Sequence, residues 1–148
     1  MDIAKSRDSA DNSAHLLRLE LMVDTSVLKA LRLALLRLHK TLLDWERAAY
    51  ERVHGRQSSH ALLEALLQDP QFSWLRPISQ LVVRIDEMLE DDVPPGENDL
   101  EVILAHVRDL TRADEAGNPY EQRYFAALQG NPDAVFAHRD VVTLLKGP

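Results

Sequence analysis

Apolar residues recur in steps of three and four between residues 28 and 49, which is the spacing of one face of an α-helix. This leucine seam consists of Leu28, Leu31, Leu35, Leu38, Leu42, Trp45 and Ala49. Leu17 and Leu21 keep the same phase upstream, and Asp24 is the polar break between them and the seam. The pattern predicts one long amphipathic helix over residues 13–54, with residues 24–26 as the point where an interruption would fall.

A row of polar residues runs along the middle of this apolar face. A second apolar stripe lies about 100° around the helix from the seam, and it consists of Leu36, Leu43 and Tyr50. The row between the two stripes holds Arg32, His39 and Glu46. Three interpretations of the row stay open: a buried network that fixes helix register, a helix–helix interface, and a pocket in which His39 binds a ligand or transfers a proton.

Polar groups in the middle of a buried face are costly unless they are paired, so we expect partners for this row on a neighbouring helix. The candidates lie in the segment 72–89, and they are Arg76, Ser79, Arg84 and Asp86. Pairing of Arg76 with Glu46, or of Asp86 with His39, would satisfy members of the row. The register between the helices decides which pairs form.

Three large apolar residues, Phe72, Trp74 and Leu75, crowd the same segment just before Pro77. They either anchor the core at a kink or form an exposed edge for a protein partner, because tryptophan is favoured in binding hot spots. Both interpretations stay open.

Glycine and proline divide the rest of the chain into shorter helices. A proline directly after Asp or Asn marks three helix starts, since proline fits the first helical position and the preceding side chain caps it. Asn118 with Glu121, and Asn98 with Glu101, have the spacing of capping boxes. Pro77 should kink or divide the segment in which it lies. The shorter helices are expected at residues 59–68, 70–90, 98–112, 119–129 and 132–145.

The predicted fold is all-α, because no alternating strand pattern of useful length interrupts these helices. We expect a bundle of about five to six helices around the long amphipathic N-terminal helix, kinked near Pro77. Residues 1–12 are polar and are expected to form a disordered tail. Residues 13–148 are expected to form a single domain, since a chain of 148 residues can bury a core of its own.

Composition narrows the classes of function. The chain has no cysteine, which excludes disulfides and thiolate zinc sites, and its six histidines show no repeated ligand spacing. We therefore predict no metal and no cofactor. The net charge of −7 disfavours nucleic acid, and no apolar run reaches the ~20 residues of a membrane helix. The polar N-terminus resembles no signal peptide, so the expected location is cytoplasmic.

Two strings, LHKTLLDWERAAYERVHG and FSWLRPISQLVVRIDEMLE, resemble a pattern found in short bacterial proteins of no assigned function. In that pattern H-K-x-L-L-D-x-E-R-x-x-Y-E precedes F-x-W-L-R-P-x-S-x-L-x-V-x-I-D-E, and these positions are residues 39–51 and 72–87 here. The segment YFAALQGNPDAVFAH also resembles it. The resemblance implies a bacterial origin and brings no activity, cofactor or partner.

Two hypotheses of function follow. The first is a non-enzymatic helical domain that acts through protein–protein contacts, with a homodimer along the long helix as one form of it. The alternative is a bundle with an internal small-molecule or metal pocket near His39 and Glu46. Residues 86–101 hold eight acids and no base. This acidic run is interpreted as a solubilising turn, with docking of a basic partner as the alternative.

Overall fold

The computed structural model describes the backbone of residues 3–92 and 95–146, and the side chains within these ranges except those of residues 3–8 and 18–24. Over the described residues the chain is all-α, as the sequence predicts, and contains no strand. It forms α1 (Ile3–His54), α2 (Ser59–Gln68), α3 (Pro70–Ser73), α4 (Arg76–Glu90), α5 (Glu97–Leu110), α6 (Pro119–Gly130) and α7 (Pro132–Leu145).

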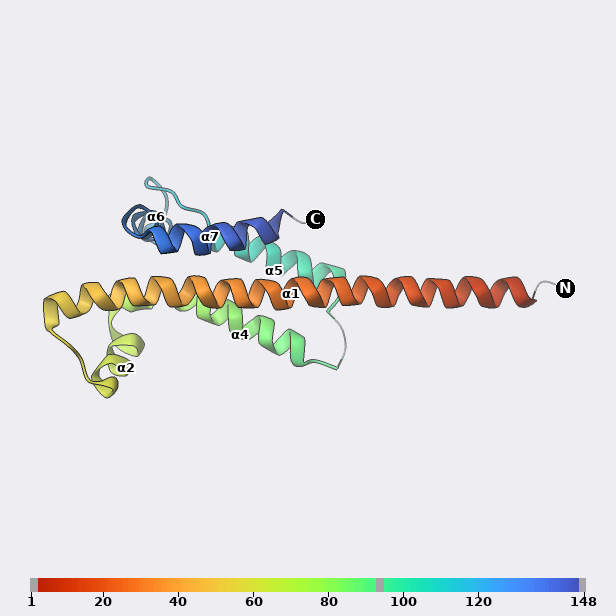
Figure 1. The fold of residues 1–148 in the computed structure, drawn as a ribbon, viewed down its shortest axis with the longest axis horizontal. Coiled ribbons are helices and arrows are strands. Elements are labelled where there is room, and N and C mark those ends of the chain that lie inside the picture. Colours follow the sequence, from red (N-terminus) through yellow and green to blue (C-terminus); the bar gives the residue numbers. More distant parts are fainter. Residues whose placement is uncertain (1–2, 93–94, 147–148) are drawn as a thin grey trace.

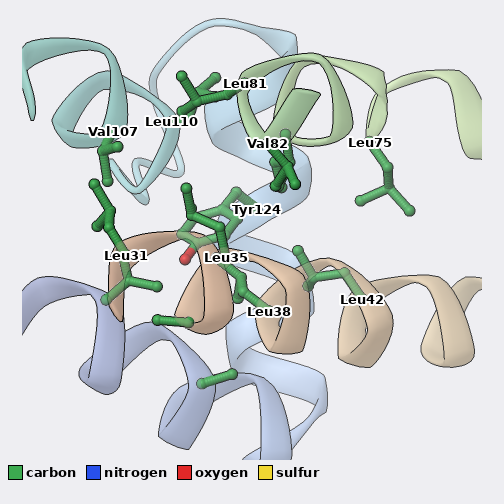
Figure 2. Close-up of a cluster of buried hydrophobic side chains, with 14 of the residues drawn as sticks. Leu31, Leu35, Leu38, Leu42, Leu75, Leu81, Val82, Val107, Leu110 and Tyr124 are labelled. Atoms are coloured by element: carbon green, nitrogen blue, oxygen red, sulfur yellow. The ribbon is translucent and has the colours of Figure 1, made fainter. Parts of the chain in front are cut away.

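The long helix α1 is the axis of the fold (Figure 1). In this view α2 and α4 lie on one side of α1, and α5, α6 and α7 lie on the other. The predicted leucine seam is buried between them, since Leu28, Leu31, Leu35, Leu38 and Leu42 are fully covered. Figure 2 shows part of this core, in which the seam meets Leu81 and Val82 of α4 and Val107 of α5. Burial contributes about 1.5–3 kcal/mol for each such side chain, so the seam is a substantial part of what stabilises the fold.

The start of α1 corrects the prediction of a disordered tail at residues 1–12. The helix begins at Ile3 and continues without interruption through residues 24–26, while residues 1–2 lie outside the described range. No glycine or proline stands between residues 3 and 54, so nothing in the sequence forces the helix to stop. In Figure 1 the N-terminal part of α1 extends beyond all the other helices. We call residues 3–17 the arm; its described side chains, those of residues 9–17, are all exposed.

The helix boundaries follow local capping, with one correction. Gly55 ends α1 in a left-handed conformation, with φ of 79°. The predicted box at α6 is present, since Asn118 Oδ1 accepts from the Glu121 N–H at 2.8 Å and Glu121 Oε1 accepts from the Asn118 N–H at 3.3 Å.

The box predicted from Asn98 and Glu101 is wrong. Gly96 is the N-cap of α5, and its N–H donates to Asp99 Oδ2 at 3.0 Å. This earlier start places two acids, Glu97 and Asp99, in the first turn, where the positive end of the helix dipole favours them.

The helix predicted at residues 70–90 is divided, so the bundle has more helices than the expected five to six. α3 ends at Ser73, a turn follows at Trp74 and Leu75, and α4 begins at Arg76. Pro77 lies in the first turn of α4, where its missing N–H costs nothing, instead of inside a longer helix where it would remove a hydrogen bond. The division turns Trp74 and Leu75 toward α1, and it places the Trp74 indole N–H beside Glu46.

Candidate functional site

Glu46 is the buried member of the polar row, with only 8% of its surface exposed. Its Oε1 accepts a hydrogen bond from the Trp74 indole N–H at 3.0 Å, and its Oε2 accepts from Gln71 Nε2 at 3.1 Å. Gln71 Nε2 also donates to the Glu46 carbonyl at 3.2 Å. Both carboxylate oxygens are therefore occupied by donors from the α3 region. The charge is held by neutral groups, since no ion pair reaches Glu46 in the described part of the chain.

Arg32, at the other end of the row, pairs with Asp86 of α4. Arg32 Nε donates to Asp86 Oδ1, and both side chains are more than one-third exposed. Such a partly solvated ion pair contributes little stability, typically less than about 1 kcal/mol.

The two pairs considered from the sequence, Arg76 with Glu46 and Asp86 with His39, are wrong. Arg76 instead donates to the Leu67 carbonyl at 3.0 Å, at the C-terminal end of α2. The reason is register. Because α4 runs antiparallel to α1, Trp74 lies beside Glu46 and Asp86 lies beside Arg32.

The same register brings His39 opposite Ser79, where a groove opens between α1, α2 and the α3–α4 region. The groove has a volume of about 200 Å³, and it is lined by His39, Leu43, Leu66, Leu67, Phe72, Leu75, Arg76 and Ser79. His39 is half-buried, and burial lowers the pKa of its ring. No hydrogen bond or ion pair reaches this ring from the described residues. His39 is thus the member of the row whose ring nitrogens have no hydrogen-bond partner among the described residues.

Phe72, Trp74 and Leu75 do not form the exposed edge that was one interpretation of the sequence. All three are buried, so the interpretation of core anchoring describes them. The Trp74 ring can be buried because Glu46 satisfies its N–H. Phe72 packs against Tyr50 of α1, with ring centroids 5.4 Å apart.

A series of aromatic contacts continues from Trp74 across the core, and sequence reasoning missed it. The Trp74 and Tyr120 rings lie 5.6 Å apart edge to face, and those of Tyr120 and Tyr124 are stacked at 6.0 Å. The hydroxyl of Tyr124 lies 2.6 Å from Nδ1 of His138 on α7, and Figure 2 shows Tyr124 among the leucines of α1. The four-residue spacing of the tyrosines was the available signal, because it places both on one face of a helix.

Burial changes the proton affinities in this series. It raises the pKa of Tyr120 well above its ordinary value, and it raises that of Tyr124 further, with the neighbouring Tyr120 adding to the effect. Burial lowers the pKa of His138. The Tyr124 hydroxyl keeps its proton and shares a hydrogen bond with Nδ1 of His138, and the tautomer of the histidine ring sets which of the two groups donates. Tyr120 donates to the Leu110 carbonyl at 2.7 Å. Both tyrosine hydroxyls therefore have partners, and these contacts tie α5, α6 and α7 together.

The site offers no geometry for a metal ion in the parts that the structure describes. No group of three or more His, Asp or Glu side chains comes together there. His39 and Glu46 do not share a pocket, because Glu46 is enclosed by its two donors while His39 faces the groove. A metal pocket made by these two residues is therefore not supported by their positions.

Comparison of the chain with protein-family models, with curated proteins and with solved structures finds no match. The resemblance to a bacterial sequence pattern stays a prediction. Within residues 3–92 and 95–146, no helix is both long enough and apolar enough to cross a membrane.

Proposed function

We propose that this chain is a non-catalytic protein-interaction domain that forms a homodimer through the arm of α1. The observation that supports this proposal is the exposure of two large apolar side chains on the arm. Leu16 is 53% exposed and Leu17 is 59% exposed. Both belong to the arm, and the arm is the part of α1 that extends beyond the other helices (Figure 1).

A helix without packing contacts is a weak structure in water. Isolated helices shorter than ~12–15 residues are marginal, and helices in proteins gain most of their stability from burying an apolar face. Leu17 keeps the phase of the leucine seam, which is fully covered from Leu28 to Leu42 inside the bundle. The arm therefore extends the apolar face of α1 beyond the part of the helix that the other helices of this chain cover.

A second copy of the same chain is the partner that fits best. A leucine seam packs against another leucine seam, as in coiled coils. Residues 3–20 carry three bases, Lys5, Arg7 and Arg18, and three acids, Asp8, Asp11 and Glu20, so this stretch has no net charge. The whole chain carries −7. Within the arm, Lys5 and Arg7 balance Asp8 and Asp11, so no net charge opposes the meeting of two copies there.

The proposal needs no cofactor and no catalytic group. The cytoplasm is the compartment that we propose, because the chain contains no cysteine. Nucleic acid and membranes are not the partners we propose, since the acidic net charge disfavours both kinds of polyanionic surface.

Light scattering after size exclusion tests the dimer. We expect the wild-type chain to have twice its monomer mass of 16.8 kDa at micromolar and higher concentrations. The double variant Leu16→Asp/Leu17→Asp should have the monomer mass and still show cooperative thermal unfolding of the bundle.

Val53→Asp is the matched control, because Val53 is 77% exposed at the opposite end of the same helix. It should leave the dimer intact. A monomeric wild type, or loss of the dimer in both variants alike, would refute pairing through the arm.

A further inference from the structure

The groove at His39 has the composition of a small-molecule site. Five of its eight lining residues are apolar, namely Leu43, Leu66, Leu67, Phe72 and Leu75. The other three, His39, Arg76 and Ser79, are polar, and none of the lining residues is acidic. Ligand pockets in proteins combine apolar walls with a few polar groups in this way.

The polar groups of the groove favour an anion. Arg76 uses one donor on the Leu67 carbonyl at 3.0 Å, which holds its side chain over α2. A guanidinium has five donors, and no carboxylate pairs with Arg76 among the described residues. Ser79 already donates its hydroxyl proton to the Arg76 carbonyl at 3.0 Å. Arg76 and His39 are therefore the donors that remain for a ligand.

His39 suits a ligand because the fold leaves it without another role. Its ring is half-buried in the groove wall, and in the described part of the chain nothing is bonded to it. A neutral imidazole still has one N–H donor and one acceptor nitrogen. The neighbours of His39 in the row both have partners. Arg32 pairs with Asp86. Glu46 accepts hydrogen bonds from Trp74 and Gln71.

We infer that the groove binds a small carboxylate with an apolar body, held by Arg76 and His39 at its charged end and by the leucines at the other. The volume of about 200 Å³ sets the size of the ligand. A cavity of ~150 Å³ lined by apolar residues holds a benzene molecule. The groove therefore fits a body of that size, such as a six-carbon chain, together with its carboxylate. This inference does not depend on dimerisation.

Binding is tested by NMR on ¹⁵N-labelled full-length protein titrated with sodium hexanoate and, separately, with hexan-1-ol. The two probes share the apolar chain and differ in charge. We expect saturable shifts at the amides of Leu67, Arg76 and Ser79, and an affinity at least about tenfold higher for hexanoate, because hydrogen bonds to a charged group are the stronger kind. Equal affinity for the two probes, or shifts that do not saturate, would overturn the inference.

Two variants separate the charged contact from the apolar one. Arg76→Gln should weaken hexanoate binding by roughly 10-fold to 100-fold and leave hexan-1-ol unchanged. Arg108→Gln, at an exposed position on α5, is the control and should change neither. Leu66→Phe adds bulk to the groove wall and should weaken both probes together. If Arg76→Gln binds hexanoate as the wild type does, the groove does not recognise a carboxylate.

The arm of a second copy is the competing occupant, and the Leu16→Asp/Leu17→Asp variant tests it. We expect this variant to bind hexanoate with the same affinity as the wild type. A gain of tenfold or more would mean that the arm fills the groove, and it would overturn the assignment of the site to a small carboxylate.

Discussion

Glu46 and His39 lie on the same row of α1, about two turns apart, and the fold gives them opposite environments. Glu46 is buried, and both of its oxygens accept hydrogen bonds from the α3 region. His39 is half-buried in the wall of a groove, and nothing is bonded to its ring within the described residues. Their positions on the helical wheel are equivalent, so the difference arises outside α1.

The neighbouring segment supplies that difference. Gln71 and Trp74 have long side chains with N–H donors, and these donors reach the Glu46 carboxylate. Two turns along, the residue opposite His39 is Ser79, which is short and turns its hydroxyl back to the Arg76 carbonyl. A polar residue on a buried face thus becomes structural or free according to what the opposite helix presents. We interpret Glu46 as a structural residue and His39 as the candidate for binding.

Removal of the Glu46 carboxylate should have the largest effect on stability. Glu46→Ala leaves the Trp74 indole without its acceptor, leaves Gln71 Nε2 with only the backbone carbonyl of residue 46, and opens a cavity. We expect a loss of about 2–4 kcal/mol in the free energy of unfolding, measured by urea denaturation. Glu51→Ala is the control, since Glu51 makes a surface pair with Arg47 and should cost less than about 0.5 kcal/mol. Equal losses in the two variants would contradict the structural role of Glu46.

Removal of one donor to Glu46 should cost less than removal of Glu46 itself. Trp74→Phe keeps most of the buried ring but removes the N–H that binds Oε1 at 3.0 Å. We expect a loss of about 1–3 kcal/mol by thermal or urea unfolding, because one oxygen of a buried carboxylate loses its partner. Trp45→Phe is the control, since Trp45 is only partly buried and lies against Gly130. A larger loss in the control would show that aromatic volume, not the hydrogen bond, sets the cost.

The stability of the fold should fall as the pH is lowered below about 6.5. Burial lowers the pKa of both His39 and His138 in the folded state, so the unfolded chain binds more protons in this range. The stabilisation is fully present above the ordinary histidine pKa of about 6.5 and is lost as the pH falls through the folded values. Urea titrations at several pH values measure it. His39→Leu should reduce the slope, and a slope unchanged by this substitution would mean that His39 does not contribute.

Replacement of His39 should have the smallest effect at neutral pH. His39→Leu removes no hydrogen bond to a described residue and adds an apolar side chain beside Leu43 and Leu75. We expect a change in the free energy of unfolding within about 0.5 kcal/mol at pH 7.5, measured by urea denaturation. A loss comparable to that of Glu46→Ala would mean that the two residues do not differ as described.

Much of the architecture could be predicted from local patterns. The spacing of Leu28 to Leu42 predicts the buried seam, because burial of an apolar face needs only the period of the helix. Asn118 with Glu121, and Gly55, mark their boundaries because capping acts within one turn. The wrong N-cap predicted for α5 also has a local origin. Gly96 with Asp99 and Asn98 with Glu101 both have the spacing of a capping box, and the two spacings start only two residues apart.

The sequence by itself determined that a polar row crosses a buried face of α1 and that helices must pack on it. Only the tertiary structure decided that Arg32 meets Asp86, that Glu46 meets Trp74 and that His39 meets a groove. The physical reason is that these pairs depend on the register between two antiparallel helices. The turn at Trp74 and Leu75 and the packing of the whole core set that register, and no local spacing encodes it.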